Sequence, residues 1–147
     1  MYKNILIPTD GSDTAEKAVA AGIEFAREAN ARVTWFTAVP EYQPPSEAEV
    51  MAKHAISFEE HNKRSRESAE RILAGPAHRA YSAGIACETD YAQSNHPHQA
   101  IIAAAKRHGC DLILMSSHGR KGLRALFLGS ETRDVLTHST IPMLVYR

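Results

Sequence analysis

Short apolar runs alternate with longer amphipathic segments along the whole chain. Each run is bounded by proline, glycine or charged residues, which is typical of a strand buried on both faces of a sheet. We expect strands at residues 5–7, 33–39, 85–91, 112–115 and 142–146. Between them, apolar residues recur with the spacing of a helix that buries one face. This alternation predicts an α/β domain with a five-stranded parallel sheet, doubly wound and covered by helices on both faces.

The helical segments carry their own start and stop signals. Asp13 is expected to be the N-cap of the first helix, and Glu16 three residues later completes a capping box. The segment 47–83 is helical, polar and long, and Gly75-Pro76 interrupts it, so a kink or a break is expected there. Further helices are expected at 97–108 and 130–138. A sheet wound in this way is flavodoxin-like or Rossmann-like, and it binds ligands at the carboxyl ends of strands, where the strand order reverses.

Composition adds limits on the function. The 147 residues suit a single domain, 1–147. Lys and Arg together number 17, as do Asp and Glu, which argues against a nucleic-acid binder, since such proteins carry a basic excess. No apolar run approaches the roughly 20 residues of a membrane span, and the N-terminus lacks the pattern of a signal peptide. Because Cys87 and Cys110 form no disulfide framework, we expect a cytoplasmic protein with neither nucleic-acid nor membrane partners.

Two loops that follow predicted strands carry candidate chemistry. The first is Pro8-Thr9-Asp10-Gly11-Ser12, which offers a hydroxyl, a carboxylate and a helix N-terminus. The alternative is an ordinary strand-to-helix turn, since Asp-Gly-Ser is common in turns. If the first and fourth strands are neighbours, this loop faces the second candidate loop across one crevice.

The second loop begins at Ser116-Ser117-His118-Gly119 and ends, nine residues later, at Gly129-Ser130. Glycines allow close approach of the backbone to a phosphate, and a helix N-terminus favours an anion. Ser130 is expected to cap the last helix or to donate to a phosphate oxygen. The alternative is a mobile basic loop with Ser130 as a cap only. The sequence is neither a P-loop nor a G-x-G-x-x-G turn.

At these loops, and over essentially the whole chain, the sequence resembles the universal stress protein family. The ATP-binding branch of that family carries G-x-x-G-x9-G-S/T after the fourth strand, and Ser116-x-x-Gly119-x9-Gly129-Ser130 lies on that motif. Ser116 replaces the first glycine, which is costly if the position needs a positive φ. A second branch lacks the motif and does not bind ATP. The resemblance is closer to the binding branch, and it implies a Rossmann-like fold of the adenine nucleotide alpha hydrolase type.

By position, the resemblance implies a site for ATP. Mg²⁺ could bind there together with the phosphates. Thr9 and Asp10 would lie at the adenosine end. Val39 and Met115 would be apolar walls for adenine, with Ala38 as the alternative to Val39. Ribose and phosphates would lie among the two serines, the glycines and the start of the last helix. The implied cofactor-binding residues are Pro8, Thr9, Asp10, Val39, Met115, Ser116, Ser117, Gly119, Gly129, Ser130 and Glu131.

Three functions stay open on these grounds. The first is an ATP-binding regulatory protein of the stress response, the second is a slow ATPase, and the third is an interaction module of the non-binding branch. No residue is identified as catalytic, because none stands out as a base that activates water. No metal site is predicted either, since the histidines lack a carboxylate or cysteine at a recognised spacing.

The closing strand predicts a homodimer. As the last strand of such a topology, 142–146 should lie at a sheet edge, where its N–H and C=O groups are unpaired. Antiparallel pairing of Met143-Leu144-Val145 with a second copy would cover that edge, and the resemblance implies the same arrangement. The alternative is that the long helical segment 47–83 covers it.

Overall fold

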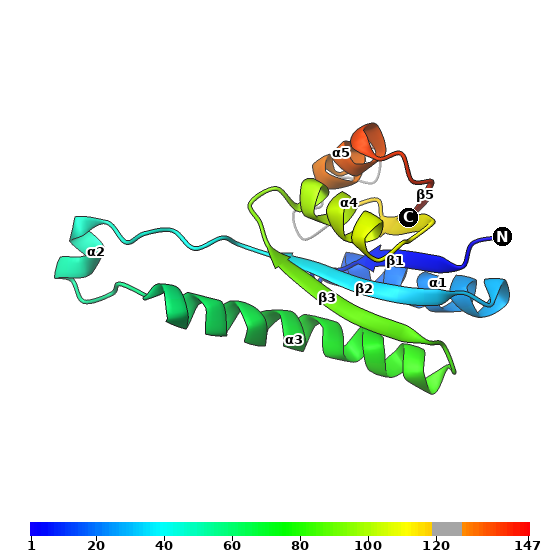
Figure 1. Ribbon diagram of the computed structural model, residues 1–147, viewed down its shortest axis with the longest axis horizontal. Coiled ribbons are helices and arrows are strands. Elements are labelled where there is room, and N and C mark those ends of the chain that lie inside the picture. Colours follow the sequence, from blue (N-terminus) through cyan, green and yellow to red (C-terminus); the bar gives the residue numbers. More distant parts are fainter. Residues whose placement is uncertain (119–127) are drawn as a thin grey trace.

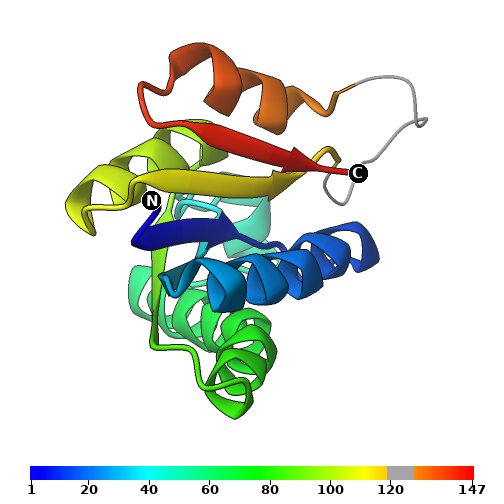
Figure 2. The same ribbon diagram turned by 90° about the vertical axis from the view of Figure 1, so that its right-hand side faces the viewer.

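The computed structural model describes residues 1–118 and 128–147. Its strands form one parallel sheet in the order β3-β2-β1-β4-β5. Helices α1 and α3 pack on one face, and α4 and α5 pack on the other (Figure 2). The expected fold class is therefore confirmed. The elements are β1 Asn4–Pro8, α1 Asp13–Ala29, β2 Arg32–Val39, α2 Glu47–Met51, α3 Phe58–Ser82, β3 Cys87–Gln93, α4 Pro97–Arg107, β4 Leu112–Ser116, α5 Ser130–His138 and β5 Met143–Tyr146.

The strand order reverses between β1 and β4, which pair directly. From β1 the chain moves outward to β2 and β3, and then returns across the sheet to β4 and β5. This is the Rossmann-type order, because flavodoxin-type winding places the third strand beside the first. Right-handed crossovers in opposite directions place their helices on opposite faces of the sheet. A crevice therefore opens where β1 and β4 end, with both candidate loops beside it.

The core has one layer on each face of the sheet. Ile7 and Trp35 face α1 and α3, whereas Leu6 and Phe36 face α4 and α5. All four side chains are fully buried, as expected for a sheet covered on both faces. Gly22 lets α1 lie close to the sheet, because an added Cβ would collide with the side chain of Ile7.

The predicted N-cap of the first helix is wrong, and the helical segment does not break at Gly75-Pro76. The N-cap of α1 is Ser12, whose Oγ accepts from the backbone N–H of Ala15 at 3.2 Å, and Asp13 is the first helical residue. The long helical segment is interrupted between α2 and α3, at residues 52–57, whereas Pro76 lies buried inside an unbroken α3. The apolar face of α3 continues across the proline, so packing against the sheet outweighs the backbone bond that proline removes.

An arm formed by residues 40–57 projects from the body and carries α2 at its tip (Figure 1). Tyr42 meets the ring of Phe58 edge-on at 5.4 Å, which fixes the arm to the start of α3. Within residues 1–118 and 128–147, no helix has the length and apolar character that a membrane crossing requires.

Strand β5 lies at the sheet edge, as expected. Its exposure alternates, and Leu144 and Tyr146 are 39% and 41% exposed. Helix α3 does not cover it, because α3 packs against β2 and β3 at the other end of the sheet. The alternative in which the long helical segment protects the closing strand is therefore wrong.

Candidate functional site

An open cavity of about 650 Å³, its mouth included, lies at the carboxyl ends of β1, β2 and β4. Helices α4 and α5 form its other side. Six of the eleven predicted site residues line it, namely Pro8, Thr9, Asp10, Met115, Ser116 and Glu131. The remaining lining residues are Ala15, Thr37, Ala38, Pro97, Ile101 and Thr132. The crevice expected from the strand order is thus present, and both candidate loops reach it.

The loop after β1 is ordered by its own hydrogen bonds. The backbone N–H of Thr9 donates to the carbonyl of Phe36 at 2.9 Å. Its Oγ1 accepts from the N–H of Gly11 at 3.2 Å, and Asp10 Oδ1 accepts from the N–H of Ser12 at 2.9 Å. Gly11 has φ +77°, a conformation that favours glycine. The loop is a regular turn, and it also presents Thr9 and Asp10 to the cavity.

Ser116 has ordinary strand backbone. Among the described residues, only Asn30 and Lys53 combine a side chain with positive φ, so the serine that replaces the family's first glycine is not strained. Its Oγ donates to the carbonyl of His118 at 2.7 Å, and its own carbonyl accepts from Thr132 Oγ1 at 2.9 Å. Ser116 therefore fixes the start of the loop that follows β4.

Gly129 packs directly against that loop. Its N–H donates to the carbonyl of Ser117 at 2.7 Å. An added Cβ would lie 2.9 Å from that carbonyl oxygen and 3.3 Å from His118 Cα. The missing side chain thus accommodates the protein's own backbone. Gly119, the other predicted glycine, lies outside the described residues.

Ser130 does not cap α5. Gly129 occupies the N-cap position, and Ser130 is the first helical residue, without a side-chain cap hydrogen bond. The prediction of a serine cap is wrong by one position, since only the residue before the first turn can cap it. The first amides of α5 have no partner within the helix, which makes this helix start suitable for an anion.

The apolar wall beside β2 is formed by Ala38 instead of Val39. Ala38 lines the cavity, whereas Val39 is only 4% exposed and does not. Neighbouring strand residues point to opposite faces, and Ala38 shares the face of Phe36 and Ile101. Met115 from β4 completes the apolar part of the cavity.

Glu131 joins the cavity to α4. Its Oε2 accepts from the backbone N–H of His98 at 2.9 Å, so the carboxylate caps the start of α4. Asp10 is the other described carboxylate at the cavity, and no described Lys, Arg or His lines it. The sequence could not reveal the contribution of α4, because Pro97 and Ile101 reach the cavity only through the packing of α4 beside β4.

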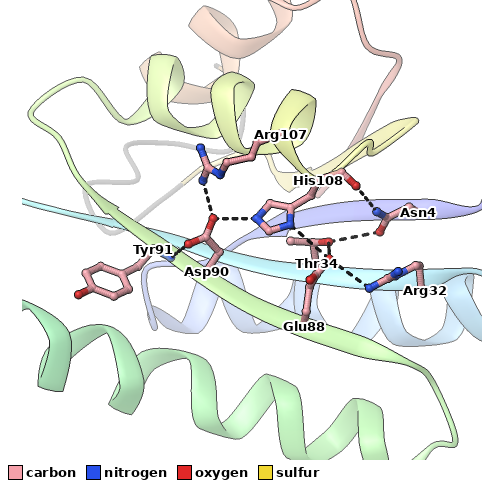
Figure 3. Close-up of polar contacts among 8 residues, drawn as sticks. All are labelled: Asn4, Arg32, Thr34, Glu88, Asp90, Tyr91, Arg107 and His108. Atoms are coloured by element: carbon pink, nitrogen blue, oxygen red, sulfur yellow. Dashed lines mark hydrogen bonds and ion pairs between the residues drawn. The ribbon is translucent and has the colours of Figure 1, made fainter.

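A second polar cluster lies at the far end of α4 (Figure 3). His108 Nε2 lies 2.8 Å from Asp90 Oδ2, and its Nδ1 lies 3.3 Å from Glu88 Oε1. Although burial raises the pKa of Asp90, hydrogen bonds from Arg107 and His108 outweigh it and hold that pKa below its ordinary value. None of these residues lines the cavity. The cluster connects edge strand β3 to the end of α4, and no spacing in the sequence indicates it.

The cavity residues fit an adenine nucleotide. Ala38, Ile101 and Met115 form an apolar wall of the kind that a purine ring needs. Thr9 and Asp10 supply a hydroxyl and a carboxylate to the same cavity. Helix α5 begins at its rim, and the first backbone N–H groups of that helix have no partner within the helix. The two carboxylates also offer oxygen ligands of the type that Mg²⁺ prefers.

Comparison with known proteins gives a consistent result. A family model described as the universal stress protein family matches residues 1–147. The chain is 30% identical to universal stress protein YxiE of Bacillus subtilis, with 100% of each chain covered. It is also 30% identical to the solved structure of protein MJ0577 of Methanocaldococcus jannaschii, with a TM-score of 0.78 and coverage of 99% and 95%.

Two further structures share the fold and were solved with ligands. One is a universal stress protein in complex with cAMP, at 24% identity and a TM-score of 0.64, with coverage of 99% and 97%. The other, from Archaeoglobus fulgidus in complex with dAMP, is 18% identical with a TM-score of 0.68 and coverage of 99% and 98%. At this identity, both structures show likeness of fold.

Proposed function

The chain belongs to the universal stress protein family, and on that premise we propose that it binds an adenine nucleotide, ATP, as a regulatory protein of the stress response. The observation that carries the proposal is the cavity at the reversal of strand order, with both candidate loops at its rim. Doubly wound sheets bind their ligands at this place. Relatives of the same fold bind cAMP and dAMP, so the ligand class agrees with the chemistry of the cavity.

In this proposal, adenine lies against Ala38, Ile101 and Met115. The ribose lies near Thr9 and Asp10, and the phosphates extend toward Ser116 and the start of α5. Mg²⁺ would bind between the phosphates and the carboxylates of Asp10 and Glu131.

The protein acts by binding rather than by rapid turnover. The two described carboxylates at the cavity, Asp10 and Glu131, each accept a hydrogen bond from a backbone N–H. No described histidine lines the cavity, so within residues 1–118 and 128–147 no side chain is placed as a dedicated base for water. We place the protein in the cytoplasm, where Cys87 and Cys110 remain free thiols.

We also propose that two copies pair through β5. This strand leaves one edge of the sheet open, with Leu144 and Tyr146 exposed on it. Antiparallel pairing of two such edges satisfies both sets of backbone groups and buries these side chains.

Two variants of neighbouring residues on β2 test the position of the nucleotide. Ala38→Leu fills the apolar part of the cavity and should weaken ATP binding at least tenfold in a folded protein. Val39→Ala is the matched control: it costs stability by creating a buried cavity, and affinity should stay unchanged. Calorimetric titration with ATP measures both. Weak binding by Val39→Ala, together with normal binding by Ala38→Leu, would refute the proposed position.

A further inference from the structure

Three potential metal ligands meet between the start of α4 and helix α5. They are His98, Glu131 and Asp134, and one donor atom from each lies within 4.8 Å of the others. Glu131 and Asp134 are three residues apart on α5 and therefore share a helix face. His98 comes from the first turn of α4. We propose that these side chains form a binding site for a divalent transition-metal ion of the Zn²⁺ type.

A separate observation points to a missing ligand at His98. Its Nδ1 is buried and has no hydrogen-bond partner in the described part of the chain, although the side chain as a whole is 18% exposed. Glu131 Oε2 lies 3.6 Å from this nitrogen, which is too far for a hydrogen bond. A buried polar atom without a partner costs free energy. A cation bound to Nδ1 would remove that cost.

The spacing suits a shared ion. Imidazole nitrogen and carboxylate oxygen bind Zn²⁺ at about 2.0–2.2 Å, so two donors on one tetrahedral ion lie about 3.3–3.6 Å apart. The 3.6 Å between His98 Nδ1 and Glu131 Oε2 agrees with this value. The backbone N–H of His98 donates to that same oxygen at 2.9 Å. This hydrogen bond orients the Glu131 carboxylate without itself contacting the ion. The carboxylate of Asp134 has a donor oxygen within 4.8 Å of the other two donors.

His138, one turn after Asp134 on α5, lies beside this cluster without belonging to it. Its ring lies 5.5 Å from the ring of His98, measured between centroids. His138 Nδ1 lies 2.8 Å from the carbonyl oxygen of Asp134, and since a carbonyl only accepts, this nitrogen carries the proton. Nε2 is then the nitrogen with an available lone pair. Histidine ligands of metals are commonly held by such a bond at their other nitrogen.

The donor set determines the class of ion. An imidazole beside two carboxylates favours Zn²⁺, Co²⁺ or Ni²⁺, whereas Mg²⁺ and Ca²⁺ prefer oxygen ligands alone. Glu131 belongs both to this cluster and to the wall of the cavity. All donors nevertheless come from the chain itself, so the inference stands without the nucleotide.

Titration of chelator-treated protein with Co²⁺, in the absence of nucleotide, tests the inference. One equivalent should bind and give the strong visible absorption of a tetrahedral site, and Zn²⁺ should displace it. His98→Ala and Asp134→Asn should each weaken Co²⁺ binding at least tenfold. Even the loss of a residue that only hydrogen-bonds to a metal ligand weakens metal affinity by about tenfold or more. His96→Ala is the matched control, because His96 precedes α4 and lies outside the cluster.

Two results would overturn the inference. Absence of stoichiometric Co²⁺ binding would show that the Glu131 carboxylate serves only as a cap and ion-pair partner of His98. Unchanged affinity in Asp134→Asn would place the ion elsewhere, and this variant decides the question even if His98→Ala fails to fold. Calorimetry with ATP on the same variants separates the two proposals, because Asp134 does not line the cavity and Asp134→Asn should bind nucleotide normally.

Discussion

Replacing Gly129 by alanine is expected to destabilise the protein before any ligand is present. The new Cβ would lie 2.9 Å from the carbonyl oxygen of Ser117, whereas ordinary contact begins at 3.4 Å, so the loop must move by about 0.5 Å. That movement strains the 2.7 Å hydrogen bond between Gly129 N–H and the same oxygen. Overpacking against backbone costs about 1–3 kcal/mol, and the reduced freedom of the unfolded chain returns about 0.4–1 kcal/mol.

We therefore expect Gly129→Ala to lower the free energy of unfolding by about 1–2 kcal/mol, or the Tm by about 2–8 °C for a chain of this size. Ser130→Ala is the matched control at the next residue. Ser130 is exposed and makes no cap hydrogen bond, so the change should stay within about 0.5 kcal/mol.

Urea denaturation of the three proteins, followed by circular dichroism, measures both values. Since the moved residues Ser117 and His118 directly follow Ser116, which lines the cavity, Gly129→Ala should also bind ATP more weakly. Equal stability of Gly129→Ala and the parent would refute the close packing. A loss of about 1 kcal/mol in Ser130→Ala would instead restore the serine cap that the sequence suggested.

Three further changes test other parts of the account. Ser116→Gly restores the family motif. Because the Ser116 hydroxyl orders the loop and its backbone is unstrained, we expect weaker ATP binding, and a tighter complex by calorimetry would contradict this. The carbonyls of Pro142 and Tyr146 accept from β4, so the alternate residue Val145 directs its N–H to the open edge. Val145→Pro removes that donor, so light scattering should show a dimeric parent and a monomeric variant; a parent that is monomeric at tens of micromolar would end the dimer proposal. Asp90 has a lowered pKa in the folded state, so its stabilisation is present above its unfolded pKa and is lost as the pH falls through the folded value. Asp90→Asn should therefore destabilise more at about pH 7 than at about pH 3, and a difference in urea midpoint independent of pH would argue against the contacts with Arg107 and His108.

The sequence was sufficient for the sheet and for the position of the cavity. A run such as Ile5–Ile7 has no polar face, so it fits only a strand covered on both sides, and the alternation of elements then predicts a parallel sheet with helices on both faces. The Rossmann-type strand order itself is visible only in the structure, because flavodoxin-like sheets show the same alternation. The Asp10-Gly11 turn is equally local, because its hydrogen bonds join residues two apart. These features depend on nearest neighbours along the chain, which a sequence shows directly.

The finer parts of the site depend on contacts between distant segments. Ala38 replaces Val39 as the wall because one residue along a strand reverses the direction of the side chain. The role of Gly129 becomes visible only when α5 lies against Ser117. The meeting of His98 with Glu131 follows from the packing of α4 beside α5, and no spacing in the sequence signals it.

Titration of the purified chain with Mg-ATP, followed by both calorimetry and thermal unfolding, tests the central claim most directly. One equivalent of ATP should bind, and at a free concentration of 100 times Kd the folded state should gain about 2.7 kcal/mol. The Tm should rise accordingly with the concentration of nucleotide. A flat calorimetric trace and an unchanged Tm in millimolar Mg-ATP would contradict the claim that this cavity is a nucleotide site.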